Sequence, residues 1–256
     1  MQHAVAQLRT DRLARSSKPF LARGGLKGAR CTGCRLLPSH CLCPWRPQVA
    51  THAGICLLMA DTEPLKPSNT GWLIADVVPE TFAFGWARTS TDPRLPALLQ
   101  DPQWQPLVVF PPEYAAPGRV LQQLPAAPTP ASTTTGRRPL FILLDGTWSE
   151  ARKMFRKTPV LDSLPVLQLR PDQATQERPA YQLRRAKRGD HFCTSEVAAL
   201  CLAEAGDHHA ARVLQAYLDV FTHHYLQARH QLPVDPGGQA HQRLQALTAP
   251  DRACRR

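Results

Sequence analysis

Four cysteines near the start of the chain have the residue type and spacing of metal ligands. Cys31 and Cys34 form a Cys-x-x-Cys pair, and after six intervening residues Cys41 and Cys43 form a Cys-x-Cys pair. Four thiolates in so short a segment can surround a Zn²⁺ ion with no open coordination position, as in a structural site. His40 could replace one cysteine, and a redox-active pair is a second alternative, although no thioredoxin-like pattern surrounds these residues. We predict structural zinc.

The second motif is the turn Asp145-Gly146-Thr147-Trp148, which directly follows an apolar run. If that run is a strand, Asp145 lies at its carboxyl end, where open α/β sheets bind their ligands. Gly146 permits a tight turn, and Thr147 with Glu150 has the spacing of a capping box, which predicts a helix from Trp148 onward. Asp145 is therefore a candidate general base, and a polar residue that merely ends a strand is the alternative.

The helix predicted over residues 148–157 is strongly basic on one side. Its inner face would consist of Ala151, Met154 and Phe155. Its outer face carries four cations, namely Arg152, Lys153, Arg156 and Lys157. These cations lie close to the carboxylate in the sequence and suit the phosphate oxygens of a nucleic acid, with a solvated charged face as the alternative.

Two other turns carry polar side chains. Asp61 follows a predicted strand, and Ser68 or Asn69 can cap the helix that comes next. Thr194 can cap a later helix that has Glu196 in its first turn. Together with the turn at residue 145, these segments could converge on a small polar ligand.

The remaining cysteines favour a different interpretation. Cys56 lies in a predicted strand and Cys201 on a helix face beside a leucine, so both are expected to be buried thiols. Cys193 stands at a helix start, where the pKa of a thiol can be lowered, and a reactive role is an alternative there.

The elements that position these residues can be read from short apolar runs. Strands are predicted at residues 55–59, 81–86, 107–110, 140–144 and 166–169. Helices are predicted between them at residues 69–78 and 148–157, and later at 194–206. A closing helix has an apolar stripe of Val213, Leu214, Tyr217, Leu218, Phe221 and Tyr225. This alternation predicts an α/β fold with a mostly parallel sheet and helices on both faces.

The chain divides into four segments by composition. Residues 1–30 are rich in arginine and are expected to form a flexible basic arm, followed by the cysteine knuckle at residues 31–50. Residues 51–232 would form the catalytic domain, with a Pro/Thr-rich surface loop at residues 115–138. Residues 233–256 read as a polar tail with no clear core face.

Charge and missing motifs limit the function classes. The 31 Lys and Arg against 20 Asp and Glu favour an anionic partner, nucleic acid first and a membrane surface second. No run approaches the ~18 apolar residues of a spanning helix, and no secretory signal is evident, so a cytoplasmic protein is expected. Motifs for dinucleotides, nucleoside triphosphates, zinc proteases and serine hydrolases do not occur.

Several of these segments resemble the DTW-domain family, named for an Asp-x-Thr-Trp motif that is residues 145–148 here. The cysteine cluster, DTEPLKPSNTG, VVFPPEY, FILLDGTWSEARKMFRK and CTSEVA follow in the family order over roughly residues 30 to 206. The chain is similar to bacterial enzymes that move the 3-amino-3-carboxypropyl group of S-adenosylmethionine onto N3 of a tRNA uridine. That family is related to SPOUT methyltransferases, which implies a trefoil-knotted α/β core and tRNA as the partner.

The implied activity gives roles to the residues named above. N3 of uridine is a weak acid, so a base must remove its proton; Asp145 is the best-placed carboxylate, and Thr147 could orient it. Trp148 could stack on the unpaired base or pack under the turn. The residues expected to bind S-adenosylmethionine are Ser68, Asn69, Thr70, Gly71, Asp145, Thr194 and Glu196.

One position departs from the family pattern. Many members have a basic residue after Asn-Thr-Gly, whereas Gly71 is followed by Trp72 here, so no cation is available at that place for a phosphate or carboxylate. Two alternatives stay open: an RNA methyltransferase with the same co-substrate, and a non-catalytic zinc-containing RNA-binding protein. The oligomeric state is open as well.

Overall fold

The computed structural model describes residues 2–17, 20, 28–124, 136–169 and 192–249. Its centre is a six-stranded sheet in the order β2-β1-β5-β3-β6-β4, in which every neighbouring pair is parallel. The strands are β1 Gly54–Met59, β2 Thr81–Gly85, β3 Trp104–Val109, β4 Val120–Leu121, β5 Arg138–Asp145 and β6 Val166–Leu167. The predicted parallel α/β sheet is thus confirmed.

Continuous apolar runs form the middle of the sheet. All six residues of β1 are buried, as expected for a parallel strand covered on both faces. β5 lies between β1 and β3, and its register pairs Asp145 with Met59. The short strand β4 falls in the segment that the sequence predicted to be only a surface loop, and β6 ends two residues earlier than predicted.

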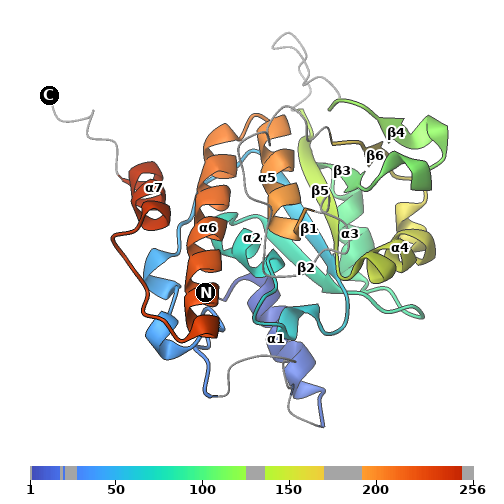
Figure 1. Cartoon of the computed structure of the whole chain (residues 1–256). Coiled ribbons are helices and arrows are strands. Elements are labelled where there is room, and N and C mark those ends of the chain that lie inside the picture. Colours follow the sequence, from blue (N-terminus) through green and yellow to red (C-terminus); the bar gives the residue numbers. More distant parts are fainter. Residues whose placement is uncertain (1, 18–19, 21–27, 125–135, 170–191, 250–256) are drawn as a thin grey trace, which may run out of the picture.

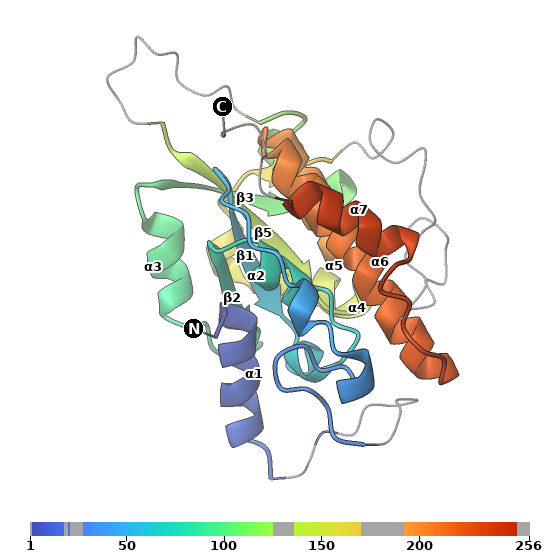
Figure 2. The same cartoon turned by 90° about the vertical axis from the view of Figure 1, so that its left-hand side faces the viewer.

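Helices cover both faces of this sheet. They are α1 Ala4–Ala14, α2 Gly71–Val77, α3 Arg94–Gln100, α4 Trp148–Lys157, α5 Thr194–Glu204, α6 His208–His230 and α7 Gln239–Thr248. Short 3-10 turns occur at Pro38–His40, Cys43–Trp45, Glu63–Leu65, Pro112–Tyr114, Pro117–Arg119 and Pro159–Leu161. Residues of α3 and α4 pack on one face of the sheet, and residues of the other five helices on the opposite face (Figures 1 and 2).

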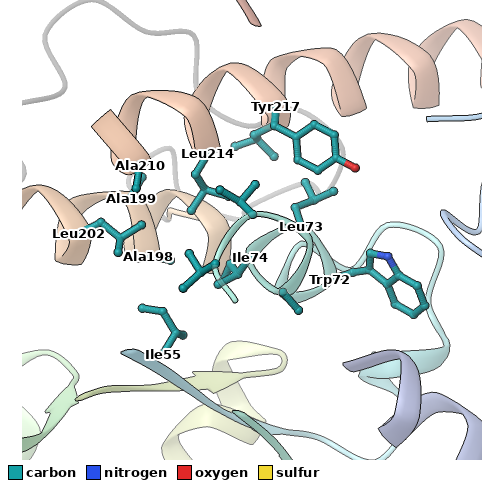
Figure 3. Packing of buried hydrophobic residues seen from close by; sticks show 14 of the residues in the cluster. Ile55, Trp72, Leu73, Ile74, Ala198, Ala199, Leu202, Ala210, Leu214 and Tyr217 are labelled. Atoms are coloured by element: carbon teal, nitrogen blue, oxygen red, sulfur yellow. The ribbon is translucent and has the colours of Figure 1, made fainter. Parts of the chain in front are cut away.

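The larger core lies between the sheet and the three helices α2, α5 and α6. Figure 3 shows side chains of these helices, among them Ile74, Leu202 and Leu214, meeting above Ile55 of β1. The stripe predicted on the closing helix is largely buried there, and Tyr217 is fully enclosed. This core fixes the positions of the segments that follow β1 and precede α5.

The N-terminal segment differs from the prediction. Residues 4–14 form α1 instead of a flexible arm, with Val5 and Leu8 buried against the core that holds α2 and β2. His3 caps the helix through a hydrogen bond to the backbone of Ala6. Because the segment is rich in basic residues, we did not predict a helix from the two apolar side chains, Val5 and Leu8, at helical spacing.

The C-terminal segment also differs. The predicted polar tail contains α7, which packs on α6 and buries His241 and Leu244. Nearly all of its other residues are polar or small, so the sequence offered little sign of a core face. Leu244 joins the core, and Ala240 and Leu247 pack against it.

Two further expectations concern the path of the chain. The implied trefoil knot stays a prediction, and residues 170–191, between β6 and α5, lie outside the described residues. Among the described helices, none combines the length and the apolar character needed to span a bilayer.

Candidate active site and metal-binding cluster

The four cysteine sulfurs lie together as the spacing predicted. The Sγ atoms of Cys31 and Cys43 are 3.6 Å apart, those of Cys31 and Cys41 are 3.6 Å apart, and those of Cys34 and Cys41 are 3.7 Å apart. All four lie within 4.8 Å of one another. A tetrahedral ion with sulfur ligands at about 2.3 Å needs sulfurs roughly 3.8 Å apart, so this cluster could hold a metal ion.

Backbone contacts hold the cluster in shape. The amide of Cys31 donates to Leu36 O at 2.8 Å, and the amide of Leu42 donates to Cys34 Sγ at 3.3 Å. A Cβ at Gly33 would lie 2.7 Å from Cys43 Sγ, so a glycine is needed where the two halves of the motif approach. The loop is therefore built around the sulfurs.

His40 does not take part in this cluster. Its ring is hydrogen-bonded to Ser39 and, through Nε2, to Leu232 O at 2.9 Å, which points the ring toward the end of α6.

Hydrogen bonds around Cys31 favour a thiolate at that position of the cluster. Burial opposes the charge, but bonds from the backbone of Cys34 and Gly33 and from neighbouring cysteines lower the pKa of Cys31 to about 7.

Asp145 lies at the carboxyl end of β5 with only 2 % of its surface exposed. Its Oδ2 accepts a hydrogen bond from Asn69 Nδ2 at 2.6 Å, and its Oδ1 accepts one from Thr194 Oγ1 at 2.6 Å. The structure thus brings together the turns after β1 and β5 and the start of α5. The carboxylate is the centre of the three polar segments named in the sequence.

Asn69 is fully buried and makes contacts in three directions. Besides Asp145, its amide nitrogen approaches Glu63 Oε2 at 3.3 Å, and its Oδ1 accepts from the backbone of Trp72 at 3.1 Å. The last contact caps the start of α2. A Cβ at Gly71 would lie 2.8 Å from Asp145 Oδ2, so the close approach of the carboxylate requires glycine there.

The turn after β1 also contacts the start of α5. Thr70 Oγ1 accepts a hydrogen bond from the backbone of Ser195 at 3.4 Å. Ser68 lies in the same turn and is partly exposed. This turn and the helix start are therefore joined at two points, by Thr70 directly and by Asn69 through Asp145.

The start of α5 corrects two expectations. The N-cap is Cys193 and not Thr194, whose hydroxyl is used on Asp145, and Glu196 completes the capping box by accepting from the Cys193 amide at 2.6 Å. Burial raises the pKa of the Cys193 thiol, which argues against a reactive thiolate. Cys56 and Cys201 are fully buried as expected.

The turn at residues 145–148 corrects a third expectation. Thr147 Oγ1 donates to Glu150 Oε2 at 2.6 Å and accepts from the Glu150 amide, which is the predicted capping box. The hydroxyl expected to orient Asp145 therefore caps α4, and Asn69 and Thr194 orient the carboxylate. Trp148 is 39 % exposed and stacks on Phe110 with ring centroids 5.4 Å apart.

The basic face of α4 is exposed as predicted. Ala151, Met154 and Phe155 are buried, and Arg152, Lys153, Arg156 and Lys157 all point outward. Within the described ranges none of these four cations forms an ion pair. A cleft of about 190 Å³ at the end of β2 includes Lys157 and Arg88 in its lining but not Asp145.

Arg35 connects the cysteine cluster to the sheet edge. It follows Cys34 directly, is only 2 % exposed and has a positive φ of 66°. Its guanidinium donates to Lys66 O at 2.6 Å and to Asn69 O at 3.2 Å, and its Cζ lies 4.1 Å from the ring centroid of Trp72. Burial lowers its pKa to about 9.

The contact with Arg35 explains why Trp72 stands where many family members have a basic residue. It also shows that Arg35 is a residue of the site that we did not predict from the sequence. Trp72 is 2 % exposed and packs beneath Arg35, so it belongs to the core and not to a ligand contact. The sequence shows Arg35 only as a cation that directly follows Cys34. Its buried contacts with the turn after β1 could not be inferred from its position beside a cysteine.

The other acidic residues near the end of β1 are already paired. Asp61 accepts two hydrogen bonds from Arg12 of α1, at 2.7 and 2.8 Å, and these hold the pKa of Asp61 below its usual value. Glu63 is fully buried and pairs with Lys66. Asp145 is the carboxylate shared by all three segments.

No solved structure matches the chain. A family model does match it, and the match agrees with the arrangement of the site. The family model described as the DTW domain matches residues 28–226, which include the cysteine cluster, the turn after β1, the Asp145 turn and the start of α5. Because the match covers most of the chain and all parts of the site, the chain belongs to the DTW-domain family.

Proposed function

We propose that this protein transfers the 3-amino-3-carboxypropyl group of S-adenosylmethionine to N3 of a uridine in tRNA. Membership of the DTW-domain family suggests a tRNA-modifying function. The observation that supports the proposal best is the buried Asp145 carboxylate, held by Asn69 and Thr194 at the carboxyl edge of the sheet. Burying a charged group is costly, so a protein that only binds RNA has no use for it there.

In the proposed reaction Asp145 removes the proton from N3 of the uridine. The N3 electron pair then attacks the carbon that joins the aminocarboxypropyl chain to sulfur. The carbon–sulfur bond breaks and its electrons stay on sulfur, which leaves 5′-methylthioadenosine. The proton passes from Asp145 to water. A carboxylate oxygen can accept two hydrogen bonds, so the bonds from Asn69 and Thr194 are compatible with this role.

The surrounding residues receive distinct roles. Asn69 and Thr194 position the carboxylate, and Gly71 leaves room for it. We assign binding of the co-substrate to the polar groups beside them, Ser68, Thr70 and Glu196. Glu196 is held at the start of α5 by its capping bond, where it can pair with the ammonium of the amino acid part.

We further propose Zn²⁺ as the ion of the cysteine cluster. The four sulfurs have the separation that tetrahedral Zn²⁺ requires, and no other ligand type is present among them. The ion would hold residues 31–43 in one shape and thereby keep Arg35 on the turn that carries Asn69. Its role would be structural.

The remaining parts of the proposal concern tRNA and the fold. The exposed cations of α4 begin close to Asp145 and suit tRNA phosphates, in a cytoplasmic enzyme. Changing Arg152 and Arg156 to Ala should flatten the salt dependence of tRNA binding by about 1.5 in slope, since two phosphate contacts are lost. We also propose a SPOUT-like core, which agrees with a parallel sheet that has β5 between β1 and β3.

Mass analysis of tRNA from cells with and without this protein tests the proposed reaction. The proposal predicts a uridine that carries an aminocarboxypropyl group only when the protein is present. A methyl group in its place would identify an RNA methyltransferase. Identical tRNA in both samples would favour the non-catalytic RNA-binding alternative.

A further inference from the structure

We propose that Tyr114 and Trp148 form a stacking platform for an unpaired nucleobase of the RNA, beside the Asp145 site. The inference rests on the proposed function for the identity of the RNA, and it extends that function by naming the surface that recognises single-stranded nucleotides. Neither a role for Tyr114 nor its pairing with Trp148 can be derived from the position of Asp145.

Two exposed aromatic side chains, Tyr114 and Trp148, lie together at one edge of the sheet. Among the described residues, four large apolar side chains are exposed: Tyr114 at 36 %, Trp148 at 39 %, Phe192 at 39 % and Leu232 at 51 %. Tyr114 follows β3, Trp148 begins α4 just after β5, and Phe192 stands two residues before Thr194. Tyr114 and Trp148 therefore both follow the carboxyl ends of paired parallel strands, at the edge of the sheet where Asp145 lies.

The two rings are fixed from below by buried aromatic residues. Phe110, which is 6 % exposed, stacks nearly parallel with Phe155 at 4.5 Å and with Trp148 at 5.4 Å. Tyr114 meets Trp148 edge-on at 5.8 Å and Phe110 at 5.3 Å. Phe110 and Phe155 already fill the core beneath, so the exposed indole and phenol are held rigidly without being needed to close it.

The charge beside the rings selects the partner. The outer face of α4 begins four residues after Trp148 and carries the exposed cations Arg152, Lys153, Arg156 and Lys157. Aromatic rings beside a row of cations are the combination that binds single-stranded nucleic acid, with rings for bases and cations for phosphates. An apolar protein partner would gain nothing from this row of charge.

The proposed reaction also requires such a surface. N3 of uridine is hidden in a base pair, so the target must be unpaired and must leave its stack. A base next to it then loses a stacking neighbour. A rigid aromatic pair close to Asp145 replaces that neighbour and holds the strand in place.

The test is fluorescence titration of the purified protein with a short single-stranded oligouridylate, and with the same strand in a duplex. We expect the single strand to quench tryptophan emission, and Trp148→Leu to remove the quenching. Tyr114→Ala should weaken single-strand affinity on the order of tenfold, as loss of a stacking ring does. The matched control is Leu232→Ala, an exposed apolar residue at the end of α6, which should change neither signal.

Three results would overturn the inference. The first is unchanged single-strand binding in both aromatic variants, provided that both melt at the wild-type temperature. The second is equal quenching of tryptophan emission by the single strand and by the duplex. The third is quenching of Trp148 emission by S-adenosylmethionine alone. If the aminocarboxypropyl product forms while single strands do not bind the rings, the inference fails and the proposed function stands. If single strands stack on Trp148 but no product forms, the reverse holds.

Discussion

In the cysteine cluster all four sulfur donors come from one short segment, whereas the groups around Asp145 come from three segments. Asn69 is 76 residues away from Asp145 in the chain, and Thr194 is 49 residues away. The cluster can form wherever its own loop folds around an ion. The site at Asp145 exists only when β1 and β5 are paired and α5 is docked. Local spacing is therefore enough to predict the first, and only the assembled sheet creates the second.

The two regions are nevertheless joined by one buried side chain. Arg35 belongs to the cysteine loop in sequence and to the turn after β1 in its contacts. This makes the comparison testable, because a change in one region can reach the other through that contact.

Asp145→Asn should lower the transfer rate by on the order of 10²–10⁴, the usual contribution of a positioned base. The amide keeps the shape but cannot take the N3 proton, so affinity for S-adenosylmethionine and for tRNA should be retained. Rate should be partly restored at higher pH, because more uridine ionises without help. Single-turnover kinetics and equilibrium binding measure these effects.

The control for this variant is Asp162→Asn, which alters an exposed carboxylate after α4 and should leave the rate unchanged. A normal rate in Asp145→Asn would mean that the carboxylate is only a polar strand end. Loss of S-adenosylmethionine binding would assign Asp145 to the co-substrate and not to the proton.

Cys34→Ser should remove most of the bound metal, from about one ion per chain, because a four-ligand site loses a thiolate. The free energy of unfolding should fall by on the order of 4 kcal/mol, because loss of a metal is among the mechanisms behind the largest destabilisations. Metal analysis and urea unfolding measure the two quantities. Cys56→Ser is the control, since it makes the same change at a buried thiol far from the cluster and should keep the metal. Full metal content in Cys34→Ser would contradict the cluster as a four-thiolate site.

The sequence predicted the sheet well because buried parallel strands are continuous apolar runs, and it predicted α4 to the residue because Thr147 and Glu150 fix its start. The prediction that Thr147 orients Asp145 was wrong, because the hydroxyl that caps α4 is not free to bond to that carboxylate. Helix α1 was missed because residues 1–30 are rich in arginine and the helix buries only two apolar residues, Val5 and Leu8. Arg35 and Tyr114 contact residues far away in the chain, and no local pattern in the sequence reports such contacts.

Arg35→Met should reduce the transfer rate on the order of tenfold to a hundredfold while the metal stays bound, because a small displacement of Asn69 would misplace the carboxylate. The loss should appear in kcat more than in KM. Arg35→Lys should restore part of the rate, since lysine can still donate to one of the two carbonyl groups. If the metal is lost together with activity, Arg35 supports the cysteine loop and does not position the active site.

The smallest effect concerns the support of the cysteine loop by α6 and α7. His224 Nδ1 bonds to His40 O at 3.1 Å and its Nε2 to His241 Nε2 at 2.8 Å, and burial lowers the pKa of His224 to about 4. Because this pKa lies below the unfolded value of about 6.5, the neutral ring stabilises the fold above that pH, and the stabilisation is lost as the pH falls toward 4.

Urea unfolding at about pH 7 and about pH 5.5 should therefore show a decrease on the order of 1 kcal/mol. His224→Gln should reduce that difference, since the variant has no proton to gain at this position. An equal pH effect in the variant would assign the decrease to other groups.

We propose that the Asp145 site transfers the aminocarboxypropyl group and not the methyl group. Two samples of S-adenosylmethionine, one labelled in the carboxyl carbon and one in the methyl carbon, test it directly with purified protein and unmodified tRNA. We expect that the carboxyl label enters tRNA, that the methyl label does not, and that Asp145→Asn abolishes most of the transfer. Methyl label in the tRNA, or carboxyl label at an undiminished rate with Asp145→Asn, would contradict it.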